Sequence, residues 1–158
     1  MDTFPSNTGI SEVRGIVKLA KDNGNSIDIS KLAKETKRGI DVLLPAIDAC
    51  RLFGICAVSG GVVTLTAMGK SLTTATKLQS EMKRRLAMME PFRSAIEIIS
   101  SKKNISTEGL SEALKGRGIT LYAEKSMNAD MVRALMLKWA VRLKLLSYDL
   151  KSDSWSLA

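Results

Sequence analysis

The hydrophobic pattern of the first part of the chain predicts three helices. Apolar residues recur at steps of three and four over residues 11–23, 31–37 and 40–54, as on one face of a helix. Ile27–Ile29 is a short extended segment between the first two helices. Gly54 supplies the left-handed residue that lets the chain leave the third helix.

Two short extended runs follow the third helix and predict a hairpin. Residues 55–58 and 62–65 flank Ser59-Gly60-Gly61, and glycine tolerates the positive φ that a tight hairpin turn needs. Three helices followed by a two-stranded wing is the order of elements in a winged helix-turn-helix. In DNA-binding members of that fold the third helix reads the bases, so we look for function there first.

The outward face of the third helix is apolar and acidic, whereas a DNA-reading helix is polar and basic. Aspartate repels phosphate, and apolar side chains offer at most contact with thymine methyl groups. A proline inside the helix lacks the backbone N–H, so the helix either begins near Val42 or has a distorted first turn. The positions that face bases in a generic helix-turn-helix are Ile40, Asp41, Val42, Leu44, Pro45 and Asp48.

A long apolar stripe in the middle of the chain predicts a connecting helix over residues 77–101. Apolar residues fall on one face of this helix, and Met82 and Met89 lie within the stripe. Pro91 either bends the helix or divides it into two. A Met-rich stripe is typical of a core or of a contact between helices.

The rest of the chain repeats the first plan. An extended segment at 104–106, a helix over 107–116 with Thr107 as its cap, a longer turn over 119–126, a helix over 128–145 and a second wing over 147–157 follow in the same order. The two halves superpose with Leu52 on Leu143, Ile55 on Leu146, Val63 on Trp155 and Leu65 on Leu157.

The predicted fold is mainly α with small β-wings: two winged helix-turn-helix subdomains joined by a long helix that Pro91 kinks or divides. Residues 1–75 form the first winged helix with an N-terminal arm, of which residues 1–9 are expected to be loose. Residues 76–103 form the connecting helix, and residues 104–158 form the second winged helix.

The available side chains argue against an enzyme. The chain contains no histidine, which removes histidine-based triads, most zinc sites and the usual general base near neutral pH. Cys50 and Cys56 alone are too few for a metal site. Gly69-Lys70-Ser71 imitates a phosphate-binding loop, but Thr64 stands where the required glycine belongs. We therefore expect no catalytic residue, no metal and no cofactor.

The chain lacks the signals of a membrane or exported protein. It has no run of about 18 uncharged apolar residues, and its N-terminus lacks the basic and apolar regions of a signal peptide. We therefore expect a cytoplasmic protein with reduced thiols and no membrane insertion.

The formal net charge of +8 raises the question of nucleic-acid binding. The excess is densest in residues 76–103, which carry seven Lys and Arg against three Asp and Glu. A basic face on a connecting helix is more often solvated than bound to DNA. The residues best placed to contact phosphate are Lys34, Lys37 and Arg38 near the helix-turn-helix turn, and Lys83, Arg84 and Arg85 in the connecting helix.

Several short motifs resemble the family of AAA-associated C-terminal domains over residues 27–158. They are Leu43-Leu44-Pro45, Leu52-Phe53-Gly54, Leu65-Thr66 with Gly69, Trp139-Ala140, Leu145-Leu146 and Tyr148-Asp149. The resemblance implies a module usually fused behind the ATP-binding subunit of nitrate/sulfonate/bicarbonate-type ABC transporters, and we expect a standalone form here. It implies no catalytic residues.

Two functions remain. We favour a non-enzymatic regulatory or protein-interaction module, linked to an ABC-type transporter ATPase, that binds a protein partner or a second copy of itself, because apolar residues on an outward helix face need a partner. The alternative is a DNA-binding transcriptional regulator whose basic surface contacts phosphate largely without sequence specificity. The candidate interaction residues are Asp41, Leu44, Pro45, Asp48, Met82 and Met89.

Overall fold

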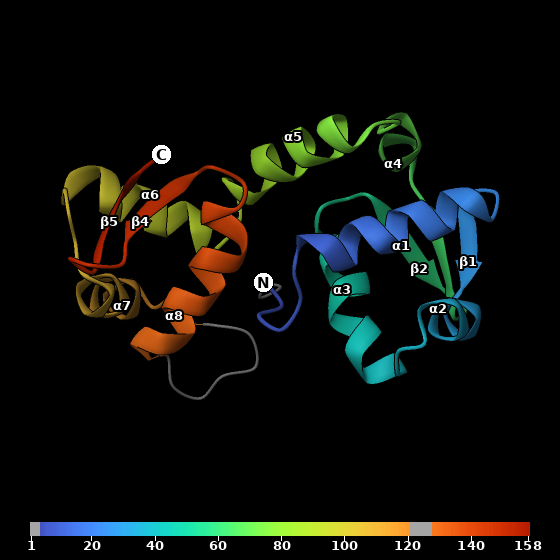
Figure 1. Ribbon diagram of the computed structural model, residues 1–158, viewed down its shortest axis with the longest axis horizontal. Helices are drawn as coiled ribbons and strands as arrows, with labels where there is room; N and C mark the ends of the chain where they lie inside the picture. Colours follow the sequence, from blue (N-terminus) through green and yellow to red (C-terminus); the bar gives the residue numbers. More distant parts are fainter. Residues whose placement is uncertain (1–3, 121–127) are drawn as a thin grey trace. The chain divides into compact units, whose positions relative to one another are not determined.

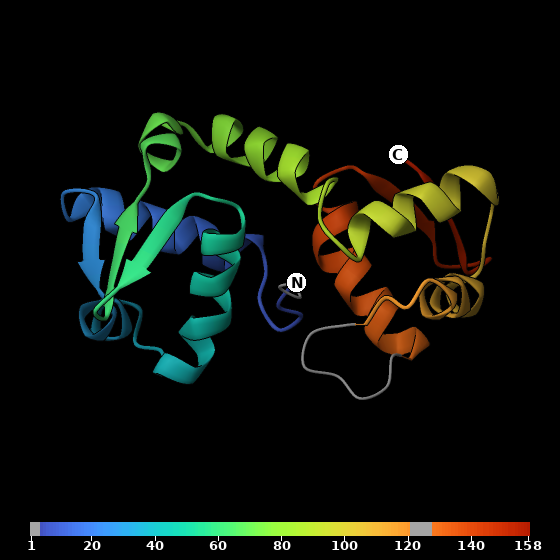
Figure 2. The same cartoon turned by 180° about the vertical axis from the view of Figure 1, so that it is seen from behind.

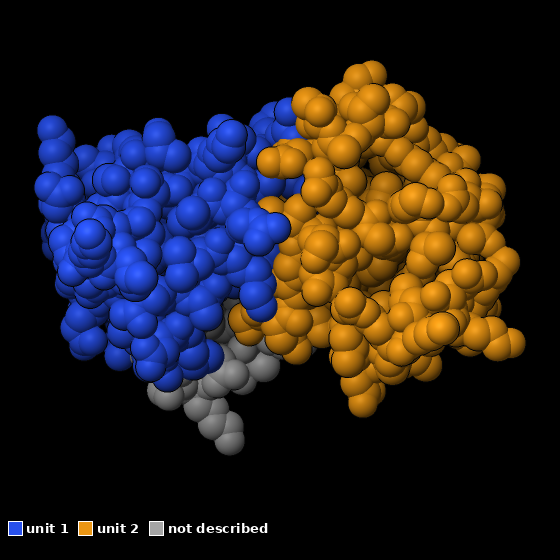
Figure 3. Space-filling view, viewed as in Figure 1, with its two compact units in different colours: residues 1–4, 80–158 blue, residues 5–79 orange. Residues whose placement is uncertain are grey.

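The chain folds into two compact units. A computed structural model describes residues 4–120 and 128–158, and Figures 1 and 2 show their helices and strands from opposite sides. The N-terminal unit comprises residues 5–79, and the C-terminal unit comprises Phe4 and the described part of residues 80–158 (Figure 3). The fold is mainly helical with small antiparallel strand pairs, as predicted. No described helix is both long and apolar enough to cross a membrane.

Helices cover a small sheet in the N-terminal unit. α1 packs against α3 and against two of the strands, and its inward residues Val13, Ile16 and Ala20 are buried. Leu32 of α2 is also fully buried. The elements are α1 (Ile10–Asp22), β1 (Ser26–Asp28), α2 (Ile29–Thr36), α3 (Ile40–Leu52), β2 (Cys56–Ser59), β3 (Val62–Leu65), α4 (Ala67–Ser71) and the first residues of α5 (Ala75–Leu86).

β2 and β3 form the predicted hairpin, and β1 joins it as a third strand. The strand order is β1-β3-β2, with both pairs antiparallel, and Ile27 lies opposite Val63. Gly60 and Gly61 take positive φ angles of 58° and 75°, as the hairpin signal requires. The sequence predicts the extended segment at Ile27 but not the strand with which it pairs.

Pro45 lies inside α3, which begins at Ile40. The Val42 N–H donates to the Gly39 carbonyl, three residues back, at 3.1 Å, and the Leu43 N–H donates to the same carbonyl at 3.3 Å. The first turn is therefore partly of the tighter 3₁₀ type. This geometry matches the predicted alternative of a distorted first turn.

Thr66 and Gly69 hold the start of α4 against the end of α3. Thr66 Oγ1 accepts the Gly69 N–H at 3.0 Å and donates to the Gly54 carbonyl at 2.7 Å. A Cβ on Gly69 would lie 2.1 Å from the Ile55 carbonyl oxygen, which no side chain permits. Close packing therefore accounts for the glycine of Gly69-Lys70-Ser71.

Pro91 divides the predicted connecting helix in two. α5 ends at Leu86, α6 begins at Phe92 and runs to Ser101, and the Glu90–Pro91 peptide bond between them is cis. The prediction of one long helix over residues 77–101 is wrong. Its alternative, two helices separated at the proline, is confirmed.

The C-terminal unit contains the end of α5, α6 (Phe92–Ser101), α7 (Thr107–Gly116), α8 (Ala129–Leu135), the π-helix η1 (Met136–Val141), β4 (Leu146–Asp149) and β5 (Ser154–Leu157). The helix predicted over residues 128–145 therefore ends earlier and changes to π-helical hydrogen bonding at Met136. Most of the turn predicted over residues 119–126 lies outside the described residues.

Aromatic rings fill the core of the C-terminal unit. Phe4 packs edge-to-face against Phe92 and Trp139, with ring centroids 5.2 Å and 4.9 Å away. Phe4 is only 2% exposed, which corrects the prediction that residues 1–9 form a loose arm. Its partners lie far along the chain, so no local pattern reveals them.

Hydrogen bonds tie the C-terminal hairpin to α7. Trp155 Nε1 donates to Thr107 Oγ1 at 2.9 Å, and this hydroxyl donates to Asp153 Oδ1 at 2.5 Å. The Tyr148 hydroxyl donates to the same carboxylate oxygen at 2.7 Å. The bond from Thr107, followed by that from Tyr148, lowers the pKa of Asp153. Thr107 was predicted to cap α7, but Ser106 occupies the capping position and Thr107 is buried.

The two units share a hydrogen-bonded turn after the third helix. The Ile55 N–H donates to the Cys50 carbonyl at 3.0 Å, and the Leu145 N–H donates to the Ala140 carbonyl at 2.8 Å. Gly54 and Lys144, which precede these donors, both have positive φ, 73° and 60°. Ile55 therefore corresponds to Leu145, and Phe53 to Leu143, so the predicted superposition at Leu146 and at Leu52 is wrong by one residue.

The repeat is confirmed in the hairpins and explains η1. Val63 lies opposite Ile27 and Trp155 lies opposite Ile105, so Val63 corresponds to Trp155 as predicted. The third helices start at Ile40 and Ala129, which leaves one more residue before the turn in the C-terminal unit. A π-helical turn accommodates one inserted residue.

Candidate functional site

Three large apolar side chains are exposed at the start of α3: Ile40, Val42 and Leu44, which we call the α3 tip. They are 47%, 53% and 47% exposed. Ile40 and Leu44 lie about 40° apart around the helix axis, whereas Val42 lies about 160° from each of them. The opposite side of the helix carries the buried Ala46 and Ala49. The first turn of α3 therefore exposes apolar side chains on two sides of the helix, and the N-terminal unit covers neither side fully.

Acidic groups accompany the α3 tip. Asp41 is exposed within it, and Asp48 lies about two turns further along the same side of the helix. Asp48 Oδ1 accepts hydrogen bonds from Arg51 Nη2 at 2.8 Å and from Arg51 Nε at 3.1 Å. The one arginine of this face is thus engaged by a neighbouring carboxylate, and the face has little attraction for phosphate.

The other candidate interaction residues do not extend this surface. Pro45 and Met82 are buried, and Met89 is half-buried. Of the candidates, the structure brings Asp41 and Leu44 together at the α3 tip. Ile40 and Val42 are exposed, although they were not among the candidate interaction residues.

The basic candidates of the N-terminal unit lie around the turn between α2 and α3. Lys34, Lys37 and Arg38 are all exposed, and Arg38 Nη1 lies 3.7 Å from Glu12 Oε1. Burial raises the pKa of Glu12, but hydrogen bonds from its own N–H and from Ser11, with the Arg38 charge, lower the pKa overall. Arg38 is therefore partly neutralised, whereas Lys34 and Lys37 present two solvated cations.

The basic candidates of α5 belong to the C-terminal unit and form a local ion-pair network. Glu81 Oε1 lies 2.5 Å from Arg84 Nη2 and 3.0 Å from Arg85 Nε. The hydrogen bond from Arg84, followed by that from Arg85, lowers the pKa of Glu81. Lys83 is exposed. The arrangement favours solvation over a dedicated phosphate-binding surface.

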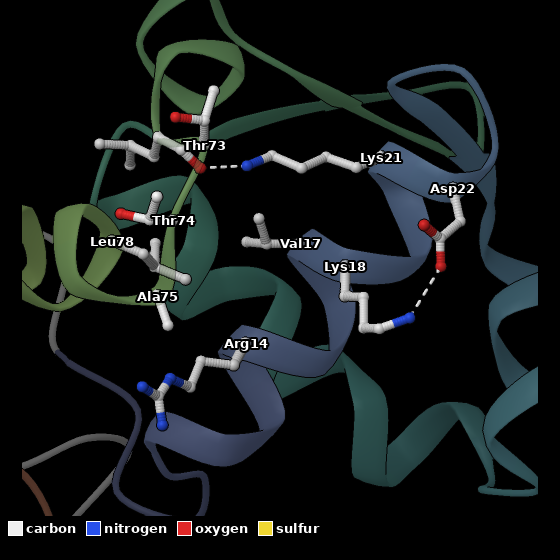
Figure 4. A pocket seen from close by; sticks show the side chains of 10 residues that line it. Arg14, Val17, Lys18, Lys21, Asp22, Thr73, Thr74, Ala75 and Leu78 are labelled. Carbon is white, nitrogen blue, oxygen red and sulfur yellow. Dashed lines mark hydrogen bonds and ion pairs between the residues drawn. The ribbon is translucent and has the colours of Figure 1, made fainter.

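A pocket in the N-terminal unit was not predicted from the sequence (Figure 4). It has a volume of about 310 Å³ and lies between α1 and the segment that joins α4 to α5. Arg14, Lys18 and Lys21 of α1 line it. Their i, i+4, i+7 spacing is a visible basic stripe, but the segment that closes the pocket lies about fifty residues away, so the stripe alone does not predict a cavity.

Residues 30–149, from α2 to the end of β4, match the family described as C-terminal AAA-associated domain. The match covers well over half of the chain. The chain belongs to this family. The part of this AAA-associated domain that matches includes the α3 tip and leaves out α1. Neither the curated proteins nor the solved structures gave a match.

The described residues of this AAA-associated domain hold no cluster of three or more His, Cys, Asp or Glu side chains that could bind a metal. Cys50 and Cys56 are both buried thiols. The hydrogen bond with Cys56, together with burial, raises the pKa of the Cys50 thiol well above its ordinary value. A thiol held protonated in this way is a poor nucleophile.

Proposed function

We propose that this C-terminal AAA-associated domain is a non-enzymatic regulatory module of two winged helices. We further propose that it binds the ATP-binding subunit of an ABC transporter through the α3 tip, in the cytoplasm. The repeated order of helices and hairpin supports the winged-helix assignment. The link to an ATP-binding subunit rests on the family.

The exposure of Ile40, Val42 and Leu44 carries the proposal. These positions face bases in a DNA-reading helix, where polar and basic side chains are needed. Completing the burial of three half-exposed aliphatic side chains is worth roughly 3 kcal/mol in total, or about a hundredfold in Kd. A protein surface can use that energy, whereas a phosphate backbone cannot.

The test is isothermal titration of the full chain with a purified ABC-type ATP-binding subunit from the same organism. We expect micromolar binding that the double substitution V42E/L44E weakens by at least about tenfold. L150E is the matched control, because Leu150 is 78% exposed on the hairpin turn of the C-terminal unit. Equal affinity for V42E/L44E and the unmodified chain would contradict the proposal.

Self-association is a separate outcome of the same variants. Light scattering that shows a dimer for the unmodified chain and a monomer for V42E/L44E would identify a second copy as the partner of the α3 tip. A dimer unaffected by these substitutions would place self-association elsewhere.

The alternative function is DNA binding, favoured by Lys34 and Lys37, which are exposed beside α3 on a chain of net charge +8. Fluorescence anisotropy with a random duplex tests it. Salt-sensitive binding tighter than about 100 µM at physiological salt, lost in K34Q/K37Q and kept in K83Q, would favour this alternative. Our proposal predicts no such binding.

A further inference from the structure

We infer that the pocket lined by Arg14, Lys18 and Lys21 binds a small organic anion that has a phosphate or carboxylate head and an apolar body. This inference is independent of the α3 tip and of the proposed function. It rests on the charge, the lining and the size of the cavity.

Cationic groups dominate the polar lining. Arg14, Lys18 and Lys21 face one carboxylate, that of Asp22, which lies 3.0 Å from Lys18 Nζ. Like charges four residues apart on a helix repel one another. Figure 4 shows Lys18 turned toward Asp22, so Arg14 and Lys21 are the cations of the lining without a carboxylate partner among the lining residues. An anion in the pocket would compensate their charge.

One of the cations is held in place by the fold. Lys21 Nζ donates to the carbonyl of Leu72, the residue that follows α4. Figure 4 shows Lys21 reaching from α1 to the facing segment, with Arg14 further along α1. Arg14 Nη2 makes a longer contact of 3.4 Å with Gln79 Oε1. Lys21 is thus fixed before any ligand arrives, which lowers the entropy lost on binding.

The rest of the lining suits an apolar body. Val17, Leu72 and Leu78 are 3%, 8% and 5% exposed and form the apolar wall. Thr73 and Thr74 of the segment opposite α1 also line the pocket. A volume of about 310 Å³ is at the lower end of the range for small-molecule sites. The pocket therefore combines a charged group of donors with an apolar wall.

The probe is phenyl phosphate, which has a dianionic head and an apolar ring. Phenol lacks the charge and inorganic phosphate lacks the ring, so they are matched controls. In an amide NMR titration of the full chain, we expect phenyl phosphate to shift residues 14–22 and 72–78 saturably. Phenol and inorganic phosphate should bind at least about tenfold more weakly.

Substitutions test which cations bind the head. R14Q/K18Q removes two exposed cations from the pocket and should weaken phenyl phosphate binding by at least about tenfold. K34Q/K37Q removes the same charge elsewhere in the N-terminal unit and should change the affinity by no more than about twofold. The amide spectrum of each variant shows directly whether it is folded, and R14E alone provides a second, single-site test in the same direction.

Three results would overturn the inference. They are equal binding of phenol and phenyl phosphate, unchanged affinity in R14Q/K18Q, and no saturable shift of residues 14–22 up to about 10 mM probe. Each would leave the role proposed for the α3 tip untouched, because the titration contains no protein partner.

Discussion

The two units are built on one plan, yet their third helices present different surfaces. Because α3 starts at Ile40 and α8 at Ala129, Leu44 corresponds to Arg133. Leu44 is half-exposed, whereas Arg133 Nη1 lies 3.1 Å from Asp130 and Arg133 Nη2 lies 3.9 Å from Asp153 of the hairpin. In the C-terminal unit an ion-paired arginine thus occupies the position of Leu44. The N-terminal unit leaves the equivalent face apolar and open.

The cores differ as well. The N-terminal core is mainly aliphatic, with Val13, Ile16 and Leu32 buried. The C-terminal core contains Phe92 and Trp139, and Phe4 from the start of the chain packs against both rings. The C-terminal unit also exposes large apolar side chains, at Met88, Leu150 and Leu157, but these lie outside its third helix. Exposed large apolar residues on the third helix, together with the basic pocket, are features of the N-terminal unit.

We expect the largest loss of stability from a substitution in the aromatic core of the C-terminal unit. F4A should lower the free energy of unfolding of the C-terminal unit by roughly 3 kcal/mol, because a buried ring is replaced by a cavity. Both tryptophans of the chain lie in this unit, so tryptophan fluorescence during urea unfolding reports it selectively. F4L should lower the free energy of unfolding by less than F4A does. An unchanged free energy of unfolding in F4A would contradict the packing of Phe4 and would support a loose N-terminal arm.

A pair of glycine substitutions addresses the N-terminal unit. G69A should lower its stability by about 1–3 kcal/mol, because the added Cβ would collide with the Ile55 carbonyl. G15A is the matched control, since a Cβ at this helical position has no neighbour within 4 Å, and it should raise stability by about 0.5–1 kcal/mol. Loss of amide NMR signals from residues 10–65 in denaturant measures both. Effects of the same sign would contradict the packing described for α4.

We expect a smaller loss of stability when the hydrogen bonds between α7 and the C-terminal hairpin are removed. T107V removes the acceptor for Trp155 Nε1 and a donor to Asp153, and should cost the C-terminal unit about 1–2 kcal/mol. T107S keeps the hydroxyl and should stay closer to the unmodified protein. Urea unfolding followed by tryptophan fluorescence distinguishes them, and a loss in T107S as large as that in T107V would contradict a stabilising role of the hydroxyl.

We expect the smallest effect in the pH dependence of stability of the C-terminal unit. Because hydrogen bonds lower the pKa of Asp153 in the folded state, its contribution is complete above the unfolded value of about 3.9 and is lost as pH falls through the folded pKa. Unfolding of the C-terminal unit between about pH 5 and pH 2 should therefore depend less on pH in D153N. The same dependence of stability on pH in D153N and in the unmodified chain would show that Asp153 does not contribute to the acid sensitivity of this unit.

Local signals predicted much of the fold. The hairpin turn depends on Gly60 and Gly61 themselves, and the end of α3 depends on Gly54, so short patterns were sufficient. Pro91 likewise predicted by itself that the connecting helix is either bent or divided, because proline disrupts helical hydrogen bonding. The one-residue insertion at η1 was missed because Met136 and its neighbours keep an ordinary helical pattern of apolar residues.

Long-range packing was not predictable in this way. Phe4 finds its partners in Phe92 and Trp139, and no spacing rule connects them. The basic pocket likewise needs α1 and residues 72–78 at once. For the α3 tip, the sequence identified an apolar and acidic outward face, but burial of Pro45 and exposure of Val42 depend on how the helix packs.

Amide hydrogen exchange tests the role of the α3 tip most directly. The chain is measured alone and in the presence of the ABC-type ATP-binding subunit. We predict slower exchange at residues 40–44 in the mixture and unchanged exchange at residues 129–133, the matching turns of the C-terminal unit. Protection confined to the C-terminal unit, or absent from residues 40–44, would contradict the proposal that the open helix face of the N-terminal unit binds the partner.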